Sequence, residues 1–367
     1  MRTFRWISIC CIWILTLLTT GCSTFVENNK IEEIAPVVFW SLRQGENGKV
    51  KISTLAPPLI NEKKRLLSLQ VDLLKLGSKD FNFKYYRELK NAQIRLLMID
   101  EGLAKQGIHS LINTLSLDPE ISSRLYLVVT KGNVEDYINS QLEKQEDLDF
   151  FIYLLFKHYE ANNEGVITVV NLHEFIKKLY SPYASPIMPV FKVSKEDFTY
   201  EGTAFFQRDR LITIAKAMDE QVFQLFNHHH YAKLLSIPEL SVGIGHIRLK
   251  QNWSIQPDRT STKLTVDLHG SIEEYRGDKD IMNPEEEVQL NREIQTRLEI
   301  QTKELLTNMQ RWKVDPLQVG NRTLRPFARP VSEQQWFNDW EHMKIDVSYR
   351  IHLHTLISLK TSSLMSP

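Results

Sequence analysis

One apolar run near the N-terminus constrains the fold of this chain more than any other feature. Residues 6–18 carry no charge, follow Arg2 and Arg5, and lead through two threonines to Gly21 and Cys22. A basic start, a short apolar run and a small residue at the cleavage point form a secretory signal. As a helix, these 13 residues would measure about 20 Å, less than the ~30 Å hydrocarbon core of a bilayer. We therefore predict that residues 1–21 are a signal peptide.

Cys22 is the predicted attachment point of a lipid. A lipoprotein cleavage site needs a small residue before a cysteine whose thiol accepts a diacylglyceryl group, and Gly21 supplies that residue. Such sites usually have leucine three positions before the cysteine, where this chain has Thr19. Two acyl chains give stable attachment where one would be marginal. An uncleaved signal anchor is the alternative, because the apolar stretch reaches 18 residues when it is counted over 4–21.

The cysteine count requires the exported chain to fold without an internal disulfide. Cys10 and Cys11 lie in the predicted signal, which leaves Cys22 as the only thiol of the mature chain. Such a chain must rest on a packed core, which 42% hydrophobic residues can supply. Basic and acidic residues both number 45, so no strong field attracts nucleic acid. We expect a water-soluble body, tied to the outer face of a cell membrane by its lipid.

The pattern of apolar residues after Cys22 predicts a multi-domain α+β fold with mixed sheets and flanking helices. Residues 22–33 are polar and form a tether to the lipid. Residues 34–190 form an N-terminal α/β region with room for two subdomains. Its expected strands are 34–43, 49–55, 92–99 and 123–129. Its expected helices are 110–116, 134–142 with Asn133 as N-cap, and 147–180.

The order of these elements predicts how two of the strands pair and where the region ends. A strand, a helical segment and a second strand over residues 92–129 imply parallel pairing. Pro182, Pro186 and Pro189 break the helical pattern and predict a linker. We therefore place the main boundary near residue 195.

Residues 196–367 predict an antiparallel sheet packed with one long helix. Residues 201–211 suggest a hairpin, and residues 262–269 and 345–354 alternate between apolar and polar side chains. The long helix is expected over 285–312, about 42 Å at 1.5 Å per residue. Asn283 can cap its start, Pro284 suits the first helical position, and Glu285 and Glu286 suit the first turn. Its apolar stripe indicates core packing rather than a cofactor site. The stripe consists of Ile294, Leu298, Leu305, Met309 and Trp312.

Histidines and acidic residues are the candidates for a metal site, and we favour structural interpretations for them. Three consecutive histidines, 228–230, cannot all face one point, so we interpret them as a solvated turn. His352 and His354 share one face of the last expected strand and could bind zinc if an acid joined them from elsewhere. The alternative, which we favour, is that both histidines lie on the solvent-exposed face of a half-buried strand. The glutamates at 285–287 suit the positive end of a helix dipole.

The sequence carries no catalytic signature. It has no serine elbow, no phosphate-cradling glycine loop and no HExxH segment. Gly243 and Gly245 lack the third glycine of a dinucleotide motif, and a modified Cys22 cannot act as a nucleophile. We therefore predict that the chain is not an enzyme and has no catalytic residues, no cofactor and no resident metal.

Several segments, in order, resemble the Ger(x)C family of bacterial spore germination lipoproteins. Residues 202–211 are similar to the family's G-T-A-V-F-x-x-D-x-L hairpin, which is the most specific match. Residues 92–108 resemble its strand and E-x-x-A-x-x-G-I turn, with Glu101 and Ala104 at matched positions. The lipid cysteine, residues 117–121, residues 172–175, the long helix with Val314 and Asp315, Trp336 to Trp340 and the closing strand follow the family's order. Residues 212–230 do not match the family's W-L and E-T-x-G elements.

The resemblance implies the lipoprotein C subunit of a nutrient germinant receptor on the outer surface of the spore's inner membrane. It also implies two integral membrane partners, the A- and B-type subunits, one of them permease-like, and a small nutrient germinant bound by the complex. A substrate-binding lipoprotein of a transporter is the alternative, but it would need two similar lobes around a cleft, and the two regions here differ. A lipid-anchored hydrolase is the third reading.

Overall fold

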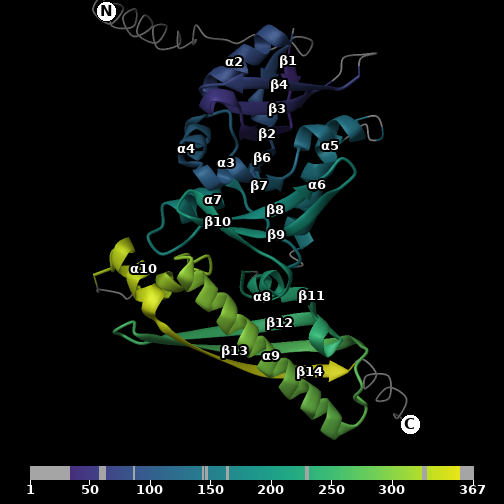
Figure 1. Cartoon of the computed structure of the whole chain (residues 1–367), viewed down its shortest axis with the longest axis vertical. Coiled ribbons are helices and arrows are strands. Elements are labelled where there is room, and N and C mark those ends of the chain that lie inside the picture. Colours follow the sequence, from purple (N-terminus) through teal and green to yellow (C-terminus); the bar gives the residue numbers. More distant parts are fainter. Residues whose placement is uncertain are drawn as a thin grey trace, which may run out of the picture.

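The computed structural model describes residues 34–57, 63–85, 87–142, 144, 148–162, 165–227, 231–324 and 329–355. The expected signal peptide 1–21, the tether 22–33 with Cys22, and the histidines 228–230 lie outside these residues. Two main sheets are stacked along the longest axis of the molecule, the larger above the smaller in Figure 1. A minor sheet pairs β1 (Ile34–Pro36) in parallel with β5 (Glu88–Lys90).

The larger sheet has eight strands and is parallel in its centre. In spatial order the strands are β10 (Arg210–Ala215), β9 (Phe198–Gln207), β8 (Ile187–Val193), β7 (Tyr126–Lys131), β6 (Leu96–Asp100), β2 (Phe39–Gln44), β3 (Val50–Ala56) and β4 (Arg65–Val71). The central strands β2, β6, β7 and β8 pair in parallel, and the strands at both margins pair antiparallel. The parallel pair β6–β7 confirms the pairing expected over residues 92–129.

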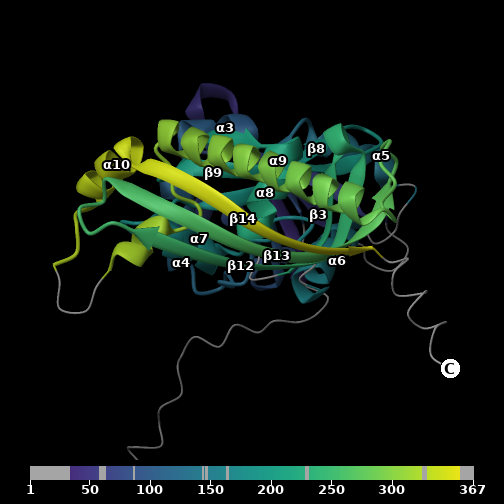
Figure 2. The ribbon, with the colours of Figure 1, turned by 90° about the horizontal axis from the view of Figure 1, so that it is seen from below.

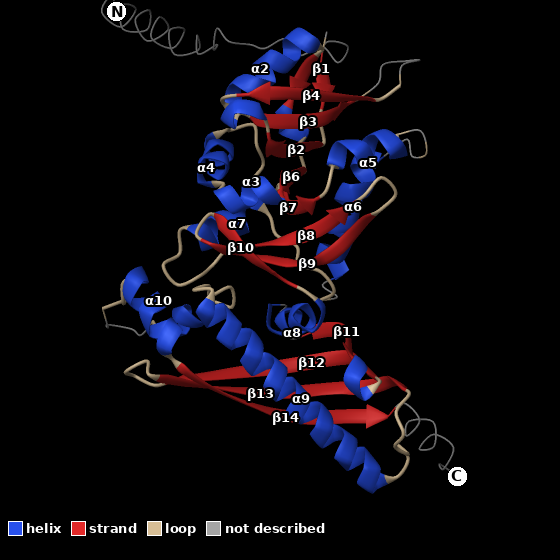
Figure 3. Ribbon diagram, in the orientation of Figure 1, coloured by secondary structure: helices blue, strands red, loops and turns tan. Residues whose placement is uncertain are grey.

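Helices cover both faces of the larger sheet (Figure 3). One face packs against α2 (Leu74–Lys84), α3 (Glu101–Gln106), α4 (His109–Leu117) and α7 (Leu172–Leu179), and the other against α5 (Val134–Gln141) and α6 (Leu148–Asn162). Leu97 shares the first core with Phe175, whereas its neighbour Met98 shares the second with Phe156. Because both faces are covered, β6 is a continuous apolar run. Asn133 caps α5 by accepting a hydrogen bond from the Glu135 N–H, as expected.

The helical stretch expected over 147–180 is divided into two helices. The chain leaves α6 to meet the larger sheet, where Asn171 forms a single bridge with Tyr126 of β7. The side chain of Asn171 then starts α7 through a capping box with Glu174. The apolar pattern continues before α7 because Ile167 and Val170 are buried.

The prediction of a linker over residues 182–189 is wrong for its second part, because β8 begins at Ile187. Pro189 lies inside this strand although proline has no N–H to donate. β8 pairs with β7 only from Val190 onward, so Pro189 leaves no bond to β7 unmade. The prolines therefore mark the entry into a strand.

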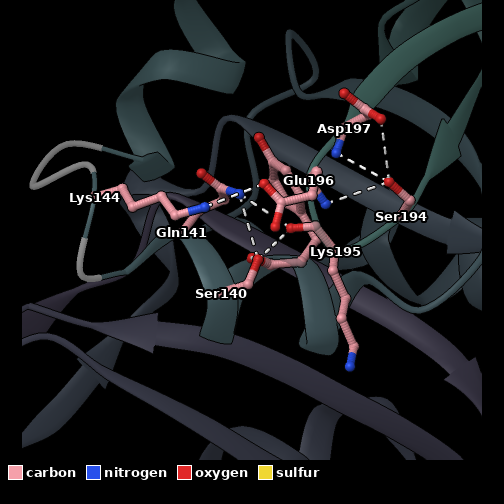
Figure 4. Close-up of polar contacts among 8 residues, drawn as sticks. Ser140, Gln141, Lys144, Ser194, Lys195, Glu196 and Asp197 are labelled. Atoms are coloured by element: carbon pink, nitrogen blue, oxygen red, sulfur yellow. Dashed lines mark hydrogen bonds and ion pairs between the residues drawn. The ribbon is translucent and has the colours of Figure 1, made fainter.

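The turn between β8 and β9, where the main boundary was expected, is fastened to the end of α5 (Figure 4). The Gln141 side-chain amide donates to the Lys195 carbonyl oxygen at 3.0 Å. Lys144 forms an ion pair with Glu196 at 3.2 Å. Inside the turn, the Asp197 N–H donates to the Ser194 hydroxyl at 3.0 Å. The turn is exposed, and these polar contacts attach it to the segment at the end of α5.

The two main sheets divide after Ala215, at the end of β10. The chain leaves the larger sheet there through α8 (Ala217–Asn227). The regions 34–190 and 196–367 therefore do not coincide with the sheets, because the hairpin of β9 and β10 extends the first sheet past residue 196. As units of folding or evolution, the two regions stay a prediction.

The smaller sheet consists of β11 (Tyr231–Ile237), β12 (Val242–Ile255), β13 (Ser261–Tyr275) and β14 (Lys344–Thr355), in that order. Its first two pairs are antiparallel, but β13 and β14 are parallel. The expectation of a wholly antiparallel sheet is therefore corrected. The chain returns from β13 through α9 (Pro284–Arg311) and α10 (Glu333–His342), which brings β14 into the sheet in the direction of β13. Leu264, Val266 and Leu268 are fully buried, as their alternation predicts.

The long helix α9 lies along the inner face of the smaller sheet, with α8 beside it (Figure 2). Asn283 caps it by accepting from the Glu285 N–H at 3.0 Å, and Pro284 is its first residue. The expected stripe is confirmed as core, since all of its residues except the half-buried Trp312 are at most 1% exposed. Among the described residues, no helix has the length and apolar character needed to cross a bilayer.

Short 3-10 helices complete the described secondary structure. They are η2 (Glu46–Gly48), η3 (Asn91–Gln93), η4 (Pro238–Leu240) and η5 (Val319–Thr323). One apolar core extends from the larger sheet through α8 to the smaller one. Phe205 of β9 meets Phe223 of α8 with ring centroids 4.9 Å apart, so the larger sheet packs directly against α8.

Candidate functional site at the junction of the sheets

His352 and His354 lie on the outer, exposed face of β14, as expected for the wet face of a strand. The imidazole of His352 stacks on that of His269 in β13, with ring centroids 4.4 Å apart. In the same row of the sheet, β12 contributes the exposed Arg248. Within the described residues, no three histidine, cysteine or acidic side chains are grouped so that they could hold a metal ion. The face presents two stacked imidazoles beside an arginine.

Asp315, after α9, is the most deeply buried acidic residue of the junction, with 0% exposure. Its carboxylate accepts hydrogen bonds from the N–H groups of Val319, at 2.9 Å, and Gly320, at 2.8 Å. Its own N–H donates to the Ser185 hydroxyl at 2.8 Å, which links it to the segment before β8. Burial raises the pKa of Asp315 to about 6, although the two backbone hydrogen bonds act in the opposite direction.

Lys178, at the end of α7, approaches the same point from the larger sheet. Its ammonium donates to the Pro316 carbonyl oxygen at 3.3 Å. Burial lowers the pKa of Lys178 to about 8, while the nearby carboxylates of Glu174 and Asp315 raise it. The hydrogen bond from Lys178 to Pro316 joins α7 to the segment that follows α9.

The aromatic side chains of α10 close this junction. Trp336 and Trp340 are fully buried and stacked, with ring centroids 5.7 Å apart. The Trp340 indole N–H donates to the Val314 carbonyl oxygen at 3.0 Å. A Cβ atom on Gly320 would lie 2.6 Å from the Trp336 ring, so only glycine lets η5 approach α10 this closely. The site is therefore built from packing and buried polar contacts together.

A second buried polar group ties α8 to the larger sheet. Glu220 of α8 is 7% exposed and accepts a hydrogen bond from the Thr203 hydroxyl of β9 at 2.9 Å. Its carboxylate also contacts the Tyr200 hydroxyl and the Gln224 amide. Burial raises the pKa of Glu220, and the hydrogen bonds oppose that shift. The helix that leads to the smaller sheet is thus held to β9 by directional bonds.

A cleft of about 670 Å³ opens beside the Asp315 junction. One wall is the turn between β9 and β10, and the opposite wall is α10, which lies on the same side of the molecule (Figure 3). Leu179 and Ala184 contribute to its apolar lining, together with the half-buried ring of Phe337. Clefts between structural units are common binding sites for small molecules, and this volume falls in their usual range.

Three basic and three acidic side chains line the cleft, and four of them form two ion pairs. Arg208 pairs with Glu333 at 3.0 Å, and Lys313 pairs with Glu341 at 2.9 Å. The side chain of Arg210 is exposed and forms no ion pair or hydrogen bond with another described residue. Such a site can hold and orient a polar molecule. Of its charged side chains, four form these two ion pairs, Asp209 accepts a hydrogen bond from the His109 N–H, and the Arg210 guanidinium does neither.

The residues of this site were only partly visible in the sequence. Residues 202–211 were identified as a hairpin, and Asp315 and Trp336 only through a family resemblance. The cleft joins residues more than one hundred positions apart, so spacing along the chain carries no signal for it. The usable signals were an aspartate directly after an apolar stripe and two tryptophans four residues apart on a helix.

Two family models match the chain, one on each side of the turn between β8 and β9. The model for the spore germination protein N-terminal domain matches residues 27–193. The model described as spore germination B3/GerAC like, C-terminal, matches residues 201–357.

Individual relatives are distant but cover most of the chain. The spore germination protein GerQC of Bacillus cereus is 19% identical over 268 residues, which cover 71% of this chain and 74% of that protein. YfkR of Bacillus subtilis strain 168, also named for spore germination, is 20% identical over 282 residues, 71% of each chain. The crystal structure of the GerBC protein aligns with a TM-score of 0.49 and 12% identity, over 86% of this chain and 96% of the other.

Proposed function

Since this chain belongs to the Ger(x)C family of spore germination proteins, we propose that it is the non-catalytic lipoprotein subunit of a nutrient germinant receptor. In this proposal Cys22 carries the lipid, and the body lies on the outer face of the spore's inner membrane. Two integral membrane subunits, of A and B type, act with it to trigger germination.

The observation that carries the proposal is the ordered match of both halves of the chain to spore germination models. The segment before the described body supports the membrane attachment, because it pairs a short signal with a single thiol at Cys22. The non-catalytic role is supported by a sequence without nucleophile or metal signatures. It is also supported by the cleft, where the acidic groups Glu333 and Glu341 are engaged in ion pairs.

The alternative, a substrate-binding lipoprotein of a transporter, predicts two similar lobes that close on a ligand. The two sheets here are unlike, because one has a parallel centre covered by helices on both faces and the other has one exposed face. They also share a continuous core through α8, which opposes hinge motion between them. The receptor role fits this architecture better.

Metabolic labelling tests the anchor. Cells given labelled palmitate should incorporate label into the mature chain, and Cys22→Ala should abolish the label and leave an uncleaved precursor. Cys11→Ala is the matched control, because its thiol lies in the predicted signal and should leave labelling intact. An unlabelled wild-type chain with the normal mature mass would contradict the lipid anchor.

A further inference from the structure

The guanidinium of Arg210 lies in a cleft where four of the other charged side chains form two ion pairs and Asp209 accepts a hydrogen bond from a backbone N–H. We propose that this cleft, between the β9–β10 turn and α10, is a binding site for a free amino acid. Arg210 holds the carboxylate of the ligand, and Phe337 packs against its side chain. The inference deepens the proposed function by placing a ligand site on this subunit, and its physiological meaning rests on that function.

The position of Arg210 is fixed by the hairpin tip before it. The Ile108 N–H donates to the Asp209 carbonyl oxygen at 3.1 Å, and the His109 N–H donates to the Asp209 carboxylate at 3.1 Å. Gly107 makes this contact feasible, since it has φ +116° and a Cβ there would lie 2.7 Å from the Asp209 carboxylate. The tip is therefore docked onto the corner between α3 and α4. The Arg210 side chain lies beside Gly107 at this corner, and the residue lines the cleft.

The facing wall is equally fixed, but it belongs to the chain segment between α9 and the smaller sheet. α10 is held by its buried tryptophans and by the bond from Trp340 to Val314. It directs Phe337, Asn338 and Glu341 into the cleft. A ligand between the walls would meet groups positioned in advance, which reduces the ordering cost of binding.

The balance of charges selects the class of ligand. A guanidinium binds a carboxylate with two parallel hydrogen bonds, and Arg210 has no competing partner among the described residues. Glu341 keeps side-chain exposure of 35% despite its ion pair, so its carboxylate can also accept from an ammonium group. A ligand with a net charge would face three groups of its own sign in the lining. A molecule with one carboxylate and one ammonium satisfies both sides.

The test is binding of each of the common amino acids, one at a time, to the full chain purified from membranes in detergent. Calorimetric titration should find saturable binding for at least one of them below about 10 mM. For that amino acid, the matching amine without the carboxylate should bind at least tenfold more weakly, because it lacks the group that Arg210 would hold. No binding by any of them would overturn the proposal.

Two variants locate the site. Arg210→Gln should weaken binding about tenfold or more, and Phe337→Ala should weaken it for apolar amino acids in particular. Arg248→Gln, an exposed arginine on the outer face of the smaller sheet, is the matched control and should leave binding unchanged. Full binding by a folded Arg210→Gln variant would contradict the site. An absence of palmitate labelling would contradict the lipid anchor without affecting amino-acid binding. A failure of the proposed function can therefore be distinguished from a failure of the proposed ligand site.

Discussion

The two main sheets bury their strands in different ways. In β6 of the larger sheet, four consecutive residues, Leu96 to Ile99, have 0% exposure, because helices cover both faces. In β13 of the smaller sheet, Leu264 is fully buried while its neighbour Lys263 is exposed. Side chains alternate between the faces of a strand, so coverage of one face or of both decides whether the sequence alternates. A polar substitution should therefore be tolerated on the exposed face of the smaller sheet but on neither face of β6 in the larger sheet.

The largest expected effect comes from a charge in the centre of the larger sheet. Leu97→Asp and Met98→Asp face opposite helical layers, and each should destabilise the protein by more than about 4 kcal/mol, since each buries an unpaired carboxylate. Chemical denaturation of the full chain measures both. If one of the two variants were as stable as the wild type, β6 would have a solvated face and the comparison would fail.

Truncation in the smaller sheet should depend on the face that is changed. Leu264→Ala removes a fully buried side chain and should lower the free energy of unfolding by about 3–4 kcal/mol. Lys263→Ala, the adjacent exposed position, should change it by less than ~0.5 kcal/mol. Equal effects in a urea titration would show that both faces of β13 are covered.

The junction between the sheets should contribute a pH dependence of stability. The folded pKa of Asp315 is about 6, above its ordinary value of 3.8, so the folded state binds this proton more tightly. The resulting stabilisation is complete below pH ~4 and is lost as the pH rises through ~6, a change of about 3 kcal/mol. Asp315→Asn should remove this component, so the stability difference between variant and wild type should vary over that range. If the stabilities of Asp315→Asn and wild type changed in parallel with pH, the raised pKa of Asp315 would be contradicted.

The smallest effect concerns the start of the helix that supports the smaller sheet. Asn283→Ala removes the cap of α9 and should cost about 1 kcal/mol, measured by thermal unfolding. Thr307→Ala, at an exposed position in the same helix, should stay within ~0.5 kcal/mol. An unchanged Asn283→Ala variant would mean that the first turn of α9 is not needed for stability.

Local patterns predicted the local structure well. The alternation around Leu264 and the stripe through Leu298 identified buried faces, and Asn133 and Asn283 were found as helix caps. In each case the signal and the structure lie within a few residues of each other. These features follow from periodicity and from the hydrogen bonds that a helix start requires.

Non-local features were predicted poorly. Pro189 suggested a linker, but it is accommodated in β8 because the neighbouring strand begins to pair one residue later. The parallel entry of β14 depends on the path of α9 and α10, which no strand pattern contains. The cleft joins Arg210 to Phe337 across the two sheets. Such contacts depend on how the elements pack, and a single sequence does not display them.

The measurement that tests the central claim most directly is isolation of the full chain with its partners from spore inner membranes. Mild detergent extraction, capture through a tag and mass spectrometry of the captured proteins should recover two integral membrane proteins, one of them permease-like, in stable amounts. Cys11→Ala should recover the same set. Recovery of an ATPase and a transport permease instead, or of no integral membrane protein, would contradict the receptor role.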